Sequence, residues 1–233
     1  MTNGPFTKLH HLCVVVHDID AAQAFYGGLL GWEFAVATPP DAPAPYVIAS
    51  LDGRDVAGLG VTAGGGQWNT YVAVDDADTA ADRAVTLGAT VVSAPADAGP
   101  GGRGATLRDP EGCEIRLWEA RRRKGAQLAN APGAWNFSNL HTADPAAAQR
   151  FYGALFPWRF VDQGWATAIS VPGYGDHLEA TVDPDIRTRQ AGAPEGIHGP
   201  SAATASSSPG HGGRVTATID SPACGAARSC DDR

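Results

Sequence analysis

Side chains that could do chemistry recur at every second position of three apolar, strand-like runs. An imidazole and a carboxylate could together hold a divalent cation or carry out acid–base catalysis. A guanidinium could pair with a carboxylate or phenolate of a ligand. Because alternate residues of a β-strand share one face, each run presents its set together, and we predict that these sets bind a small molecule. The residues are His11 and Cys13, then Asn69 and Tyr71, then Glu114, Arg116 and Trp118.

The composition of the chain indicates which kinds of molecule it can bind. The 233 residues are 43% hydrophobic and 18% charged, which is typical of a globular chain, and the net charge of −8 argues against nucleic acid. No run approaches the ~18 apolar residues of a membrane-spanning helix, and the N-terminus lacks the apolar segment of a signal peptide. The four cysteines form neither a CxxC motif nor a disulfide framework. We expect a cytoplasmic protein with a small-molecule ligand and no nucleic-acid or membrane partner.

A repeat organises the chain. The segment FYGGLLGWEF at 25–34 recurs as FYGALFPWRF at 151–160, an offset of 151 − 25 = 126. The match extends upstream, since Asp18 pairs with Asp144 at the same offset. This indicates a duplication.

The first copy predicts a βαβββ unit. Asp18 is a good helix N-cap, Gly31 a helix stop, and Asp52-Gly53 a hairpin turn. We expect strands at 9–17, 32–37, 45–51 and 55–62 and a helix at 19–30.

A second unit of the same shape follows, and a third begins at Trp135 and runs to about Val182. In the second unit, Gly88 stops the helix, and Asp109-Pro110-Glu111-Gly112 predicts a type I turn. We expect its strands at 68–76, 89–94, 103–108 and 113–119 and its helix at 77–87. The fold class is therefore α+β, built from repeated βαβββ units.

A fourth unit would begin near 188, and nothing there resembles one. Residues 191–213 are rich in Gly, Ala, Ser and Pro, and 214–220 is at most an isolated strand. The abrupt change in composition suits a truncation or a change of reading frame, which is a hypothesis. We predict a complete domain at 8–119, a solvated linker at 120–133 that contains the basic run 121–124, a half domain at 134–185, and an irregular tail at 186–233.

Three features carry a resemblance to a known family. The run from His11 to Asp18 enters an Ala-rich helix with FYGGLLGW, a second strand ends at Val74-Asp75-Asp76, and DPEGCEIRLWE occupies 109–119. The chain thereby resembles the vicinal oxygen chelate superfamily of glyoxalases, bleomycin-resistance proteins and extradiol dioxygenases. It looks most like the tandem-domain members, here with an incomplete second domain. The resemblance implies an open, U-shaped barrel around one pocket, and functions that range from isomerases to drug-sequestering proteins.

Metal-binding members of that superfamily place ligands on the first strand of each unit and on the last strand. By this resemblance the ligand positions fall on His11, Asn69 and Arg116, and 45–62 contains no Glu to supply a further carboxylate. An imidazole, a neutral amide and a cation do not make a site for a divalent ion, and Arg116 would repel one. In the third unit Phe137 replaces His11. We predict no metal and no cofactor, unless His11 and Glu114 act together on a divalent metal.

Several roles stay open. His11 is either a ligand or a pocket-lining or core histidine, and Cys13 is a small core residue as well as a lining candidate. Arg116 either binds a carboxylate or phenolate ligand or forms a structural ion pair with Glu114. Trp32 and Trp158 are either core residues of the repeat or ligand clamps.

The leading hypothesis is a metal-independent protein that binds an aromatic or oxygenated metabolite or antibiotic. The runner-up is a lyase, isomerase or hydroxylase that uses a metal through His11 and Glu114, or acid–base chemistry through His11 and Tyr71. A third hypothesis is that the chain is a non-functional or partner-dependent fragment, whose third unit leaves an unpaired sheet edge. The sequence assigns no catalytic residue, and a homodimer is plausible.

Overall fold

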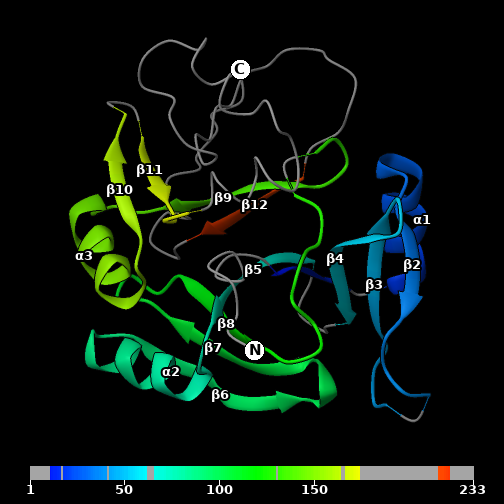
Figure 1. Cartoon of the computed structure of the whole chain (residues 1–233), viewed down its shortest axis with the longest axis horizontal. Helices are drawn as coiled ribbons and strands as arrows, with labels where there is room; N and C mark the ends of the chain where they lie inside the picture. The colour runs from blue at the N-terminus through cyan, green and yellow to red at the C-terminus, as the bar shows by residue number, and fades with distance from the viewer. Residues whose placement is uncertain are drawn as a thin grey trace, which may run out of the picture.

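The computed structural model describes residues 11–16, 18–40, 42–61, 66–129, 131–163, 166–173 and 215–220. Over these ranges the chain is α+β, as the sequence predicts (Figure 1). None of the helices in these ranges has the length and apolar character needed to cross a bilayer.

The first unit forms as expected. Asp18 caps the helix, since its Oδ1 accepts a hydrogen bond from Ala21 N at 2.9 Å, and Gly31 ends it at φ 72°. Asp52 and Gly53 both have positive φ, as a tight hairpin turn between two strands requires. The elements are β1 (His11–Val16), α1 (Ile19–Leu30), β2 (Glu33–Val36), β3 (Tyr46–Leu51) and β4 (Arg54–Val61).

The second unit repeats this order. The predicted turn closes with a hydrogen bond from Gly112 N to Asp109 O at 2.9 Å, and Asp109 Oδ1 also accepts from Cys113 N at 2.8 Å. Cys113 is fully buried and belongs to the core. The elements are β5 (Gln67–Val74), α2 (Ala77–Thr86), β6 (Thr90–Ala98), a short 3-10 turn η2 (Gly99–Gly101), β7 (Gly102–Arg108) and β8 (Glu114–Ala120).

The two units form one eight-stranded sheet in the order β2-β3-β4-β1-β5-β8-β7-β6. Within each unit the first strand pairs in parallel with the last, β1 with β4 and β5 with β8. The two first strands, β1 and β5, pair antiparallel at the centre. Because the strands at its two ends run in very different directions, the sheet is strongly curved (Figure 1).

The two helices cover one face of this sheet, which we call the outer face. Under α1 the core includes Val47, Ala49, Leu59 and Trp32, and under α2 it includes Leu107, Ile115 and Leu117. Trp32 is buried in the core, and Trp158 is half-buried against the second of these clusters. The opposite, inner face carries the candidate site.

The third unit packs on the outer face beside α2. Its elements are β9 (Trp135–His141), α3 (Pro145–Leu155), β10 (Arg159–Asp162) and β11 (Thr167–Ser170). Tyr152 on α3 donates a buried hydrogen bond to Asp109 Oδ2 at 2.8 Å. Glu111 of the same turn accepts hydrogen bonds from the Thr142 hydroxyl and from Asp144 N. The turn at 109–112 therefore holds the third unit against the second.

The expectation that 214–220 is at most an isolated strand is wrong. β12 (Val215–Asp220) pairs in parallel with β9, which lies beside it in Figure 1. This is the pairing that the last strand makes with the first in both complete units. Sequence reasoning missed it because a parallel partner is distant in sequence and leaves no local signal. The residues expected to form the third unit's own last strand, after 173, lie outside the described ranges, and the predicted domain boundaries stay predictions.

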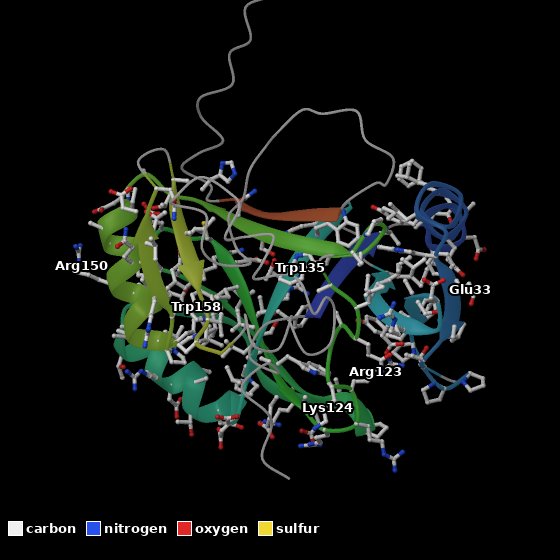
Figure 2. All side chains as sticks on the ribbon, turned by 45° about the horizontal axis from the view of Figure 1, so that its top comes forward. Glu33, Arg123, Lys124, Trp135, Arg150 and Trp158 are labelled. Carbon is white, nitrogen blue, oxygen red and sulfur yellow. The ribbon has the colours of Figure 1, made fainter. Side chains whose placement is uncertain are left out.

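The segment at 120–133, predicted as a solvated linker, is solvated only in part. Arg121, Arg122 and Lys124 are exposed, whereas Leu128 is buried. Arg121 pairs with Asp97 at 2.8 Å, and Arg123 Nη1 pairs with Asp55 Oδ2 at 3.1 Å. Leu128 and Ala134 are buried in the core under α1, and Gly133 O accepts a hydrogen bond from Trp32 Nε1. Figure 2 shows Arg123 beside the strands of the first unit, whereas Arg150 on α3 points away from the molecule.

Candidate functional site

Tyr71, Arg116 and Trp118 meet on the inner face of the sheet. Tyr71 and Arg116 lie opposite each other in the β5–β8 register. Arg116 Nη1 donates to Tyr71 Oη at 3.1 Å, and its Cζ lies 5.5 Å from the centre of the Tyr71 ring. Trp118 meets Tyr71 edge-on, with the ring centroids 6.3 Å apart. The strand alternation read from the sequence thus brings these three side chains together.

Glycines on β7 make room for the Trp118 ring. A Cβ at Gly102 would lie 2.6 Å from Trp118 Cζ2, and one at Gly104 would lie 3.4 Å from Cε3. The indole N–H donates to Arg123 O at 3.0 Å. The ring is therefore held flat against β7, and a glycine at 102 is required for this packing, whereas a Cβ at 104 would only touch the ring.

In the first unit, the ring of Tyr46 packs against a glycine of the neighbouring strand in the same way. The sequence did not identify this residue. A Cβ at Gly58 on β4 would lie 2.7 Å from Tyr46 Cζ. Gly58 is opposite Cys13 on β1, and Cys13 is opposite Asn69 on β5, so Tyr46 lies on the inner face. A glycine in the middle of an apolar strand is the signal that could have found this residue.

Asn69 is 4% exposed, and its Nδ2 donates to Gln67 O at 3.4 Å. The sequence-based choice of Asn69 therefore falls on a buried amide of the inner face. Its long, weak hydrogen bond leaves it able to orient a polar group of a ligand.

Glu114 does not pair with Arg116. Its carboxylate lies 3.0 Å from Arg108 Nη2, because Arg108 is directly opposite Glu114 in the β7–β8 register. A residue directly across a strand pair is closer than one two places along the same strand. The alternative in which Glu114 and Arg116 form an ion pair is wrong.

His11 and Cys13 lie on β1, and their side chains are outside the described part of the molecule. The register places His11 opposite Tyr71 and Cys13 opposite Asn69. Their roles stay predictions, as does ligand binding by the set of seven residues.

The residues present do not fit a divalent metal at the positions that the family resemblance implies. Asn69 supplies a neutral amide and Arg116 a cation, and Glu114 is paired with Arg108. A divalent cation bound by imidazole requires carboxylates or further imidazoles rather than a guanidinium.

One group of carboxylates within the described residues is close enough to share an ion. Atoms of Asp76, Asp78 and Glu119 lie within 4.8 Å of one another. Each already has a partner: Asp76 accepts from Thr79 N at 2.7 Å, Glu119 accepts from Ala77 N at 3.0 Å, and Asp78 pairs with Arg103 at 2.7 Å. The group therefore serves the N-terminus of α2.

Comparison with known protein families gives a match over the eight-stranded sheet. Residues 11–118 match the model of a glyoxalase-like domain. The matched residues span the two complete units, and the match agrees with the resemblance to the vicinal oxygen chelate superfamily that the motifs predicted.

Two groups of named proteins are similar to this chain. “Putative glyoxylase CFP32” of Mycobacterium bovis and Mycobacterium tuberculosis is 36% identical over 144 residues, covering 59% of this chain and 55% of that protein. The anthracycline biosynthesis protein DnrV of Streptomyces peucetius is 32% identical over 164 residues, covering 63% of this chain and 59% of DnrV. The chain therefore spans little more than half the length of the curated relatives it matches.

Solved structures give weaker likenesses. The Mn(II)-bound glyoxalase of Novosphingobium aromaticivorans is 21% identical, with a TM-score of 0.49, covering 67% of this chain and 54% of that one. The 2,3-dioxygenase LapB of Pseudomonas sp. KL28 is 18% identical, with a TM-score of 0.48, covering 66% and 59%. Likenesses at this level say nothing about a reaction.

Proposed function

We propose that this glyoxalase-like domain is a metal-independent small-molecule-binding protein. Its ligand is an aromatic or oxygenated metabolite, held on the inner face of the eight-stranded sheet. The observation that carries the proposal is the contact between Arg116 and Tyr71, with Arg116 Nη1 3.1 Å from Tyr71 Oη at a position where the family resemblance implies a metal ligand. A guanidinium there favours a ligand with oxygen acceptors over a metal ion.

The aromatic side chains of the inner face support an aromatic ligand. Tyr71 and Trp118 meet edge-on, and Trp118 is held in place by its hydrogen bond to Arg123 O. Rigid aromatic side chains next to a few polar groups suit a flat, partly polar ligand. The names of the relatives, a glyoxylase and an anthracycline biosynthesis protein, are compatible with such ligands.

Metal titration tests the proposal. Zn²⁺, Ni²⁺, Mn²⁺ and Fe²⁺ are each titrated into the purified chain, into His11→Ala, and into the control His141→Ala, whose imidazole is exposed on β9. We expect no stoichiometric binding that depends on His11. One equivalent of metal that binds to the wild type and to His141→Ala, and is lost in His11→Ala, would refute metal independence.

A thermal-shift screen tests ligand binding separately. A ligand that binds the folded state raises the melting temperature by mass action. We expect aromatic, oxygenated compounds to raise it in the wild type and less in Trp118→Ala. A screen in which such compounds shift neither protein would count against the proposed ligand class.

The β1–β5 register favours a second candidate function. His11 lies opposite Tyr71 in this register, which is the arrangement that an acid–base pair on adjacent strands needs. An isomerase or lyase built on this pair would lose turnover in both His11→Ala and Tyr71→Phe while keeping its ligand affinity. Binding without turnover in the wild type would leave the binding protein as the better account.

We also propose that the protein acts in the cytoplasm and that it pairs as a homodimer. Light scattering over a range of concentrations tests the second of these, and a monomer at all of them would contradict it.

A further inference from the structure

We propose that Arg116 anchors an anionic oxygen group of the ligand, a carboxylate, phenolate or enolate. This inference rests on the proposed function and names the chemical class of ligand that the inner face takes.

Among the described residues, no carboxylate forms an ion pair with Arg116. Within the described residues, the acidic partners of arginine are taken by other guanidinium groups: Asp78 and Asp97 by Arg103, Glu114 by Arg108, and Asp55 by Arg123. The side chain of Arg116 instead donates a hydrogen bond to the hydroxyl of Tyr71. A partly buried charge without a counterion is costly, and a bound anion would remove that cost.

The hydrogen-bonding capacity of Arg116 also supports a bound anion. A guanidinium has five N–H donors. One donates to Tyr71 Oη, and the Nε–H is buried with no acceptor among the described residues. A buried donor without an acceptor is uncommon in a native fold and calls for an explanation. A planar oxyanion would supply acceptors to several of these donors at once.

The neighbours of Arg116 define the rest of the ligand. Tyr71 lies directly across the strand pair, and Trp118 is two residues further along the same strand face. Both rings are on the side of the sheet that α1 and α2 leave uncovered. A ligand whose anionic group meets Arg116 therefore places its carbon skeleton against two aromatic rings. Aromatic acids and phenolates have this shape.

A packing role is the competing explanation for Arg116. The guanidinium lies 5.5 Å from the Tyr71 ring centre, a separation that a cation–π contact alone can account for. The two explanations differ in what a ligand's charge does. If Arg116 only packs against Tyr71, removing the charge of a ligand leaves its affinity unchanged.

A matched pair of probes separates these explanations. 1-Hydroxy-2-naphthoate carries a carboxylate, and its methyl ester has the same ring system without the charge. Calorimetry measures both probes against the wild type, Arg116→Met, Arg116→Lys and the control Arg150→Met, whose side chain points away from the molecule (Figure 2). Thermal unfolding of each variant verifies that it is folded.

We expect the wild type to bind the acid at least about tenfold more tightly than the ester, as a charge-assisted hydrogen bond predicts. Arg116→Met abolishes this preference, Arg116→Lys keeps part of it, and Arg150→Met leaves it unchanged. Equal affinity of the wild type for acid and ester, or a preference that survives in Arg116→Met, overturns the inference while the proposed binding function stands. Failure of both probes to bind the wild type counts against the inference and the proposed function together.

Discussion

Helices α1 and α3 have similar sequences and very different surroundings. Phe25 and Leu29 on α1 are each 61% exposed. Their counterparts at the 126-residue offset, Phe151 and Leu155 on α3, are 5% and 9% exposed. The difference arises because α3 packs beside α2 on the second unit, whereas no described element covers this side of α1.

The N-terminal caps of the two helices and one close contact are the same in the two copies, although α1 ends at a left-handed Gly31 and α3 at an extended Phe156. Asp18 and Asp144 each accept a hydrogen bond from the backbone N–H three residues on, at 2.9 Å in both cases. Gly27 and Gly153 each face a phenylalanine of the strand that follows, Phe34 and Phe160. A repeated sequence therefore reproduces caps and close contacts, while the burial of a helix face depends on its neighbours.

The largest expected difference between the copies is at the phenylalanines. Phe151→Ala should lower the free energy of unfolding by about 3–5 kcal/mol because it leaves a cavity between α3 and the second unit. Phe25→Ala should change it by only about 0.5 kcal/mol because that ring is mostly in water. Urea unfolding of both variants measures this. Similar losses in the two would show that α3 does not dock as described.

The tyrosines that follow them should differ next. Tyr152→Phe removes the buried hydrogen bond to Asp109 Oδ2, at a cost of about 1–3 kcal/mol, since a charged acceptor is left unsatisfied. Tyr26 is only half-buried, so Tyr26→Phe should cost less. The same unfolding experiment applies. A larger loss for Tyr26→Phe than for Tyr152→Phe would contradict the comparison.

Alkaline pH should reveal a smaller difference. Burial, and then the charge of Asp109, raise the pKa of Tyr152 above its ordinary value of 10.0. Burial also raises the pKa of Tyr26, and a hydrogen bond with Trp68 opposes this. Because a raised pKa keeps the proton on the folded protein, the stabilisation is full below pH 10.0 and declines as the pH rises beyond it.

The decline is measured by urea unfolding between about pH 8 and pH 11, where each pH unit is worth up to about 1.4 kcal/mol per group. We expect Tyr152→Phe to flatten the decline more than Tyr26→Phe does. Wild-type and Tyr152→Phe curves that remain parallel above pH 10 would rule out a Tyr152 contribution.

The smallest expected difference is at the helix caps. Asp18→Ala and Asp144→Ala should each cost about 1 kcal/mol, since each removes one N-cap hydrogen bond of the same geometry. The matched control is Asp20→Ala, which lies in the first turn of α1 without the capping bond. Thermal unfolding measures all three. Unequal effects of the two cap variants would show that the two caps contribute differently to stability although their hydrogen bonds have the same length.

Much of the fold could be predicted from the sequence because its signals are local. The caps at Asp18 and Asp76, the stop at Gly31 and the turn at Asp109–Gly112 each depend on residues a few positions apart. The burial of α3 and the pairing of β12 could not be predicted, since both depend on surfaces brought together from distant parts of the chain.

The candidate site, too, could be predicted only in part from the sequence. Period-two alternation is enough to place Tyr71, Arg116 and Trp118 on one face. It does not show that Arg108 across the strand pair takes Glu114 from Arg116, because cross-strand register is set by the whole sheet. Tyr46 was missed because its position depends on Gly58 of a neighbouring strand.

The pairing of β9 with β12 bears on the order in which the chain acquires its structure during synthesis. Residues 135–141 leave the ribosome well before residues 215–220. During synthesis β9 therefore lacks its parallel partner β12 until the intervening chain has been made. Pairings between strands so far apart in sequence form slowly. Nascent chains that stop before residue 215 would therefore expose a strand edge and depend on chaperones in a way that the finished protein does not.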